Sequence, residues 1–561
     1  MTFRTLLMFL PLLWVAAASG VMVRPWVAAV TAGVLGLCAW RRLSRGVRLG
    51  PPVPWLAGLA LWVLASGLTQ PVPRERAAQL AAVALFALVL AVVAAHPYGQ
   101  RWLACGVVAA GGLAAAWLLA ERLTVGGRPG GPFENPNVAA TLVVLALAHA
   151  WNMGRRLVWA VSPLFLAGVL ASASRAAFLA VAALAAFLVF FHSSRKVKLA
   201  MVLGLLLAGF GLSWRLLTDP DPLRFERLRI WKAAMATALA YAPWGTGPGG
   251  FGDAVLAYNF PREGEFARFH RIPDLAENDL LQLAASLGVP GLVLAGGLVG
   301  SLARALRRRR GAAWGPPLVL AVTGLFHSQL LWPVLAFSAV SAGRFSGRFR
   351  LKLAPGWAFL LCWPAVVWGA LALPWPESGL GPSAEARMAE VRALLGEGTT
   401  EGLARALVRA SDIARQLPRS AEAWRLLANA QLRLAQATGD ATAAETATVT
   451  FQKAQGLNPK SVWAHLGEAQ AWAVLAQWDR ARGAASRALR VEPRCVLCWL
   501  VLAQAQLSAG MPEEARVAFE KAQESLRKAR GYPFVSSYER ALATPDPVLL
   551  RRLAQALGVR P

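Results

Sequence analysis

The segment RFERLRIWKAAMATALAYAPWGTGPGGF (residues 224–251), continued by FARFHRIPDLAENDLLQLAASLGVPG (residues 266–291), belongs to the only long polar stretch in the first two-thirds of the chain. Apolar runs of membrane length lie on both sides of it. Of 561 residues, 56% are hydrophobic and only 16% are charged, whereas a soluble protein has about 25% charged residues. Because lipid must solvate such an apolar excess, the sequence predicts an all-α polytopic membrane protein whose helices hold this loop at a membrane surface.

Apolar runs bounded by charge, Pro or Gly predict about 12 or 13 membrane spans. They cover residues 4–20, 25–40, 53–69, 77–96, 102–120, 138–151, 157–171, 176–192, 199–216, 279–303, 314–343 and 355–373. The run 314–343 is too long for one span and too short for two, and Phe326-His327-Ser328-Gln329 interrupts it. A broken pair of half-helices is expected there.

The net charge of +28 would suggest nucleic-acid binding in a soluble protein. Here the basic residues gather in short loops between spans, which is typical of loops that stay in the cytoplasm, so we expect no nucleic acid. The clusters are Arg41–Arg48, Arg155–Arg156, Arg195–Lys198 and Arg304–Arg310. They fall on one side if the N-terminus is cytoplasmic, and residues 121–137, 172–175 and 217–278 then lie on the opposite side.

After Pro374-Trp375-Pro376 the composition changes, which predicts a membrane domain over 1–375, with its large loop at 217–278, and a second domain over 376–561. Similar helix starts recur after Pro418, Pro459 and Pro493, with one spacing of about 34 residues. They predict an α-solenoid of about three tetratricopeptide-like helical hairpins, which would bind a protein partner or serve as a solvated cap without a ligand.

The side of this second domain depends on the run 314–343. If that run returns to the cytoplasm, Arg344, Arg348, Arg350 and Lys352 obey the charge rule and the repeats are periplasmic. If it crosses once, the repeats are cytoplasmic. We expect the first arrangement.

Polar residues at the outer ends of spans are the candidate site residues, and each has a simpler structural interpretation. Asn135 and Asn137 lie in a Pro-containing turn, where Asn137 is expected to cap the next span. Arg175 begins a span and could either extend toward water or bind phosphate oxygens. The glycine run 245–250 could bring backbone N–H groups to a diphosphate, or form a flexible turn.

Further candidates lie in and after the large loop. Arg227 and Arg229 begin an amphipathic segment, and Glu277 with Asn278 closes the loop. Glu277 could act as a general base, or could be a carboxylate that favours a helix N-terminus. His327 lies at membrane depth, where a titratable residue is either functional or a hydrogen-bonded packing residue.

The cysteine pair Cys495-Val-Leu-Cys498 has no second pair to complete a zinc site. Packing is the favoured interpretation, and a local disulfide or redox role is the alternative. The sequence has no metal-ligand cluster, HExxH motif or Ser/His/Asp set, so no metal site is expected.

These pieces together resemble the O-antigen ligase/polymerase superfamily of bacterial envelope glycosyltransferases, over roughly residues 60–345. The matching motifs are Phe133-Glu-Asn-Pro-Asn137, Ser174-Arg175, Arg227-x-x-x-Trp231, Pro243-x-Gly-x-Gly-x-Gly-x-Phe251, Glu277-Asn-Asp-x-Leu281 with Gly288-x-x-Gly291, and His327. A tetratricopeptide tail is common in relatives. Glu277 stands where many members carry a catalytic His, a departure that bears on the mechanism.

The resemblance implies transfer of a glycan from an undecaprenyl-diphosphate carrier to an acceptor hydroxyl of a glycan or lipid, without metal or cofactor. It places the protein in the bacterial inner membrane with the loop in the periplasm. In this interpretation Arg227 and Glu277 are catalytic, and Arg175, Arg229, Asn278, Asn135, Asn137 and His327 bind the substrate. The alternatives are a transporter of lipid-linked sugar and a non-catalytic membrane scaffold that presents the repeats.

Overall fold

The computed structural model describes residues 24–72, 87–95, 97–125, 128–192, 226–262, 265–307, 314–326, 349–372, 384–534 and 536–559, with single residues at 9, 12 and 85. Apart from two short strands, the regular secondary structure of these residues is helical, which confirms the all-α prediction. The chain forms two compact units. One contains Met1–Gln70, Arg74–Gly249 and Leu275–Gly381, and the other contains Pro71–Pro73, Gly250–Asp274 and Pro382–Pro561. The middle of the large loop therefore packs with the repeats.

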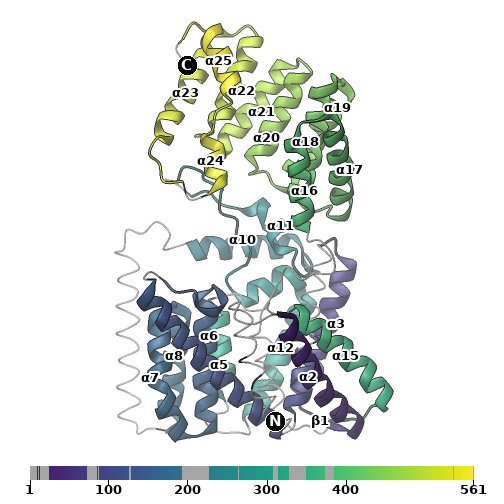
Figure 1. Ribbon diagram of the computed structural model, residues 1–561, viewed down its shortest axis with the longest axis vertical. Coiled ribbons are helices and arrows are strands. Elements are labelled where there is room, and N and C mark those ends of the chain that lie inside the picture. Colours follow the sequence, from purple (N-terminus) through teal and green to yellow (C-terminus); the bar gives the residue numbers. More distant parts are fainter. Residues whose placement is uncertain are drawn as a thin grey trace. The chain divides into compact units, whose positions relative to one another are not determined.

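The first unit consists mainly of apolar helices (Figure 1). They are α2 (Arg24–Arg45), α3 (Pro52–Thr69), α5 (Pro97–Thr124), α6 (Pro136–Met153), α7 (Arg155–Ser172), α8 (Arg175–His192), α10 (Glu226–Ala240), α12 (Asp279–Arg307), α13 (Gly315–Gly324) and α15 (Pro355–Ala372), with a 3-10 turn η1 (Gly131–Phe133). Among the described residues, three helices are long and apolar enough to cross a membrane: Pro52–Thr69, Gly99–Thr124 and Asp279–Ala305.

Several predicted spans fall where the structure gives little or no description. The runs 4–20, 77–96 and 199–216 lie wholly or partly outside the described residues. In the run 314–343, α13 ends at Gly324 and a turn follows at Leu325 and Phe326, which agrees with the expected break. The remainder of that run lies outside the described residues.

Small residues allow α5 to pack closely against its neighbours. A Cβ added to Gly111 would lie 2.2 Å from the Cβ of Ala146 on α6, and one added to Gly168 on α7 would lie 2.7 Å from Ala115. Such contacts are typical of helices in lipid, where packing rather than water exclusion holds helices together. They hold α5 directly against both α6 and α7.

A two-stranded sheet joins distant parts of the first unit. β1 (Val47–Leu49) pairs antiparallel with β2 (Phe349–Leu351), so that Arg48 lies opposite Arg350. Nearby, the Trp40 indole N–H donates to the Pro355 carbonyl at 3.0 Å. Paired strands must lie on the same side of a membrane, so the basic segments at 41–48 and 350–352 share one side. This is the arrangement expected if the run 314–343 returns to its starting side.

The second unit stacks its helices in antiparallel pairs (Figure 1). They are α16 (Ala384–Glu397), α17 (Thr400–Gln416), α18 (Ala421–Thr438), α19 (Ala441–Leu457), α20 (Val462–Val474), α21 (Trp478–Val491), α22 (Val496–Ser508), α23 (Pro512–Ala529), α24 (Ser537–Ala543) and α25 (Pro547–Ala556). Two loop elements join them: α11 (Phe251–Ala254) and η2 (Val255–Tyr258). The solenoid is thus longer than the expected three hairpins.

The sequence signals for the repeats are confirmed at their helix starts. Ser420, Ser461 and Cys495 each cap a helix, with the side chain accepting a backbone N–H three residues later. In each repeat an aromatic ring nitrogen six residues after the Pro bonds to that Pro's carbonyl. These ring residues are Trp424, His465 and Trp499, at 3.0, 3.1 and 2.9 Å. The interval from Pro418 to Pro459 is longer than that from Pro459 to Pro493, and the additional residues lengthen α18 and α19.

The residue before each of those Pro residues differs from repeat to repeat. Leu417 is buried in the core, and the Asn458 side chain accepts the Lys460 N–H at 3.0 Å. Glu492, at the third position, is fully buried. Next to it, Cys495 and Cys498 form a disulfide, whereas the sequence favoured simple packing.

Candidate functional site

The two ends of the large loop are joined by backbone hydrogen bonds. Inside α12, Gly288 leaves helical geometry (φ 63°) and Pro290 lacks an N–H, so the helix cannot satisfy its own carbonyls here. The glycine run supplies the missing donors. Thr246 N–H donates to the Ala285 carbonyl (2.8 Å), and Gly247 N–H donates to the Ser286 carbonyl (2.9 Å).

Two further hydrogen bonds hold the kink in α12. Val289 N–H donates to the Pro243 carbonyl at 2.8 Å, and the Trp62 indole donates to the Leu287 carbonyl at 2.9 Å. A Cβ on Gly288 would lie 2.1 Å from the Pro243 oxygen, so the main chains touch directly. The N–H groups of Thr246 and Gly247 are thus committed to α12. The broken helix needs these two N–H groups, and binding of a diphosphate by the rest of the glycine run stays a prediction.

Glu277 lies immediately before α12, in a left-handed backbone conformation (φ 52°) that is unusual for a residue with a side chain. Its carboxylate lies 3.9 Å from the Arg227 guanidinium, and the two side chains are 28% and 38% exposed. The Trp231 indole, one turn along α10, donates to the Glu277 carbonyl at 3.3 Å. The spacing Arg227-x-x-x-Trp231 thus places one helix face against Glu277.

Asn278 and Gln282 build the mouth of α12. The Asn278 side chain accepts the Leu281 N–H at 3.0 Å and donates to the Leu325 carbonyl at 2.9 Å, so it caps α12 and ties it to the end of α13. Gln282 accepts the Ala276 N–H at 2.8 Å and donates to Ser286 at 2.9 Å. Asn278 is only 9% exposed, and its substrate-binding role stays a prediction.

The turn before α6 forms a second wall of the site. Asn135, not Asn137 as expected, is the cap of α6: its side chain accepts the N–H groups of Asn137 and Val138. Asn137 follows Pro136 inside the helix, where its oxygen accepts from the Arg128 guanidinium at 3.0 Å and from the Ser174 hydroxyl at 2.8 Å. Of the two asparagines expected in this turn, Asn135 caps α6, and Asn137 accepts hydrogen bonds from Arg128 and Ser174.

Arg128 is a member of the site that sequence reasoning missed. Besides Asn137, its guanidinium donates to the Ser172 carbonyl at 3.2 Å. Partial burial, and then the positive charges of Arg227 and Arg175, lower the pKa of Arg128. Arg128 therefore lies close enough to both Arg175 and Arg227 for their charges to interact, and Arg227 in turn pairs with Glu277. A like-charge cluster of this kind is unfavourable unless an anion or solvent compensates it.

The remaining predicted residues are placed differently. Arg175 begins α8 directly after Ser174 and is exposed. Arg229 is exposed on α10 two residues beyond Arg227, and residues two apart do not share a helix face. His327 lies outside the described residues, so its role stays a prediction.

Strained backbone marks the same place. Among the described residues, non-glycine positive φ angles occur at Glu134, Ala173, Glu277 and Ala476. The first three adjoin Asn135, Ser174 and Asn278, and only Ala476 belongs to the repeats. Such strain costs about 1–3 kcal/mol per residue and concentrates at functional sites.

Residues 160–296 match the family model described as O-antigen ligase. This match includes Arg175, Arg227 and Glu277. It also includes both halves of the glycine junction, which is the set of backbone hydrogen bonds between residues 243–247 and 285–289. The match supports a membrane glycosyltransferase role in polysaccharide biosynthesis. Arg128, Asn135 and Asn137 precede the matched range.

Other comparisons add little. No curated protein matches the chain. A thermophilic TPR protein of Thermus thermophilus is similar at 24% identity, with 32% of this chain and 82% of that chain covered and a TM-score of 0.26. Two structures of the MamA protein are similar at 19% and 20% identity, covering 28% and 27% of this chain and 87% and 92% of theirs, with TM-scores of 0.20 and 0.18. Similarities at such TM-scores do not establish a fold, which rests on the helix pairs described above.

Proposed function

We propose that this protein transfers a glycan from an undecaprenyl-diphosphate carrier to an acceptor hydroxyl in envelope polysaccharide synthesis. The observation that carries the proposal is the Arg227–Glu277 pair, 3.9 Å apart before the start of α12, together with Arg128, whose charge interacts with those of Arg227 and Arg175. A diphosphate carries negative charge on both phosphoryl groups, and planar guanidinium groups recognise phosphate oxygens through two parallel hydrogen bonds. The cluster therefore suits this leaving group.

The chemistry assigns one task to each side of the cluster. Glu277 takes the proton of the acceptor hydroxyl, whose oxygen attacks the anomeric carbon with inversion. The bond from that carbon to the diphosphate oxygen breaks, and its electron pair stays on the lipid diphosphate. The arginines stabilise the charge that develops there. The described residues include no group of three His, Cys, Asp or Glu side chains placed to bind a metal, and this scheme requires none.

We place the cluster and the repeats in the periplasm, where the glycan-bearing carrier is presented. The segment Gly250–Asp274 shares a hydrophobic core with the repeats, so both lie on one side of the membrane. The pairing of β1 with β2 puts the start of α15 beside the Arg41–Arg48 cluster, and one crossing by α15 would then bring the repeats to the opposite side. The charge rule assigns the basic side to the cytoplasm.

The test uses purified protein in vesicles with undecaprenyl-diphosphate glycan and a hydroxyl acceptor. The parent should release carrier diphosphate and form product, whereas Arg227→Ala and Glu277→Gln should each lower turnover at least about 100-fold. Arg122→Ala, an exposed arginine in the last turn of α5, is the matched control and should behave as the parent. Translocation of the lipid without release would instead establish a transporter. Absence of both activities in the parent would favour a scaffold.

A further inference from the structure

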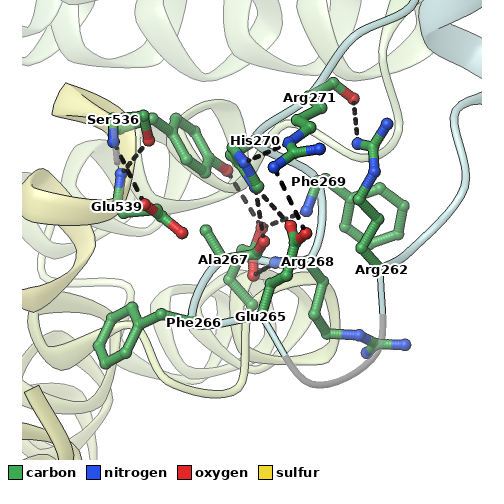
Figure 2. Close-up of polar contacts among 12 residues, drawn as sticks. Arg262, Glu265, Phe266, Ala267, Arg268, Phe269, His270, Arg271, Ser536 and Glu539 are labelled. Atoms are coloured by element: carbon green, nitrogen blue, oxygen red, sulfur yellow. Dashed lines mark hydrogen bonds and ion pairs between the residues drawn. The ribbon is translucent and has the colours of Figure 1, made fainter. Parts of the chain in front are cut away.

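The segment Glu265–Arg271 of the large loop docks into the repeats (Figure 2). Phe266, Ala267 and Phe269 are 1%, 0% and 9% exposed, and they belong to the same hydrophobic cluster as the cores of α21, α22 and α23. The Phe266 ring lies 5.4 Å from the Tyr532 ring and 5.3 Å from the Phe534 ring, measured between centroids.

The repeats hold the backbone of this segment as well as its rings. The buried Glu492 carboxylate accepts the Arg268 N–H at 2.8 Å and the Phe269 N–H at 2.9 Å. The Tyr532 hydroxyl accepts the Phe266 N–H at 3.1 Å, and Arg494 donates to the Glu265 carbonyl at 3.2 Å. A buried carboxylate is costly without such partners, so Glu492 is suited to a ligand that offers two adjacent N–H groups.

The receiving surface is built specifically for this contact. Glu492 occupies the position before Pro that Leu417 and Asn458 fill in the other repeats, where those side chains serve only their own repeat. Tyr538 donates to the Glu492 carboxylate at 3.4 Å, and a capping box between Ser536 and Glu539 fixes the helix that carries Tyr538 (Figure 2).

The segment is also preformed on its own side. Arg262 N–H donates to the Arg268 carbonyl at 2.8 Å, and the Arg262 guanidinium donates to the Arg271 carbonyl at 3.0 Å. His270 donates through Nδ1 to the Ala267 carbonyl at 2.9 Å and accepts from Arg271 at its other ring nitrogen at 3.2 Å. These bonds close the segment into a compact loop that presents Phe266 and Phe269 together.

We propose that the repeat unit is a clamp for the chain's own loop, and that docking of Glu265–Arg271 positions Glu277 for transfer. This rests on the proposed function for its catalytic consequence but not for the docking itself. The docked segment ends six residues before Glu277 along the chain, and the glycine junction fixes the main chain on the other side of Glu277. Glu277 therefore lies on a short stretch anchored at both ends. Glu492 and Phe266 are positioning residues that touch no substrate.

The docking is tested in the full chain, with a site-specific protease sequence placed between Pro376 and Pro382. After cleavage in membranes, the repeat fragment should stay with the membranes through a high-salt wash. Phe266→Ala and Ala267→Asp, which alter only the loop, should release most of it, as should Glu492→Ala. Glu514→Ala, an exposed glutamate on α23, should not. Release of the parent fragment, or equal retention of all variants, would overturn the clamp. The loop variants leave the repeat sequence intact, so their outcome does not depend on how the repeats fold.

The positioning role has a separate readout in the uncut protein. Phe266→Ala and Glu492→Ala should lower kcat about 10-fold while changing the KM for the lipid donor less than about 3-fold. If these variants released the repeat fragment after cleavage but kept the parent's kcat, the positioning role would be overturned and the docking would stand. If the parent released no carrier diphosphate while the loop variants still released the fragment, the proposed function would fail and the clamp would stand.

Discussion

Glu277 and Glu492 show how differently one chain can use the same side chain. Glu277 is partly exposed, lies in a strained backbone conformation, and faces Arg227 across 3.9 Å. Glu492 is fully buried and accepts two backbone N–H groups at hydrogen-bonding distance. The Glu277 carboxylate is therefore partly open to solvent, whereas the Glu492 carboxylate is not. Solvent exposure and the distance to the partner atoms, not the residue type, therefore distinguish Glu277, the candidate catalytic residue, from Glu492, the residue that holds the loop.

The largest expected effect is at Glu277. Glu277→Gln keeps the shape but cannot take a proton, so turnover should fall at least about 100-fold while the melting temperature stays unchanged. Glu277→His, which restores a proton acceptor, should recover part of the activity. Single-turnover product formation and thermal unfolding of the same preparations measure both quantities. Full activity of Glu277→Gln would remove the general base from the mechanism.

The next effect concerns Arg128, whose role only the folded chain reveals. Arg128→Ala removes charge-assisted bonds to the donor and should raise the KM for the lipid diphosphate about 10- to 100-fold, with a smaller change in kcat. Raising the ionic strength should raise the parent's KM as well, because exposed charges are screened. The same salt should leave the buried docking contact intact. A KM insensitive to both changes would exclude Arg128 from the site.

At Glu492 the expected effect is on stability. Glu492→Gln keeps one acceptor oxygen but turns an amide donor toward a backbone N–H, which should destabilise the repeat unit by about 1–3 kcal/mol. Denaturant unfolding, followed by a fluorophore attached to the repeats, measures this change. Glu520→Gln, an exposed glutamate on α23, is the matched control. Equal stability of the two variants would show that the docked N–H groups do not depend on the carboxylate.

The smallest effect is a difference in pH dependence between two buried glutamates. Burial raises the pKa of Glu492, and the N–H groups of Arg268 and Phe269 only partly oppose it. Burial acts in the same direction on Glu468, but hydrogen bonds from Gln452, Gln455 and Arg487 outweigh it, so the pKa of Glu468 lies below its ordinary value of 4.5. The two groups should therefore change stability in opposite directions.

For Glu492, the pKa in the folded protein is above that in the unfolded chain. Its contribution to the free energy of unfolding is therefore present at low pH and is lost as the pH rises through the raised pKa. For Glu468, the contribution is present above the unfolded pKa and is lost as the pH falls through the lowered pKa. The melting-temperature gap between parent and Glu492→Gln should thus widen on acidification, and that for Glu468→Gln should narrow. If both melting-temperature gaps changed with pH in the same direction, the opposite pKa shifts assigned to Glu492 and Glu468 would be contradicted.

Local signals in the sequence were sufficient for much of this architecture. The caps at Ser420 and Ser461 follow from a polar residue before an apolar helix, and hydrophobic runs of span length located α3, α5 and the membrane part of α12. Each of these signals lies within about one or two helical turns of the feature it predicts.

The failures share a physical cause, which is sequence separation. Arg128 lies in a turn without a motif, and its charge matters only because Arg175 and Arg227 fold beside it. The glycine run suggested an anion cradle because nothing local shows that the kink at Gly288 consumes two of its N–H groups. Glu492 and Phe269 are 223 residues apart, beyond the reach of any periodicity. Contacts of this kind become visible only in three dimensions.

The junction of Gly245 with Gly288 has a practical consequence for building hybrids between relatives. Main chain meets main chain there, so no smaller neighbouring side chain could accommodate a Cβ at either glycine. A transplanted loop would need to bring Pro243–Gly247 and Ala285–Pro290 from the same parent, since each supplies the other's missing hydrogen-bond partners. The exchangeable module therefore extends past the loop and into the first turns of the membrane helix that follows it.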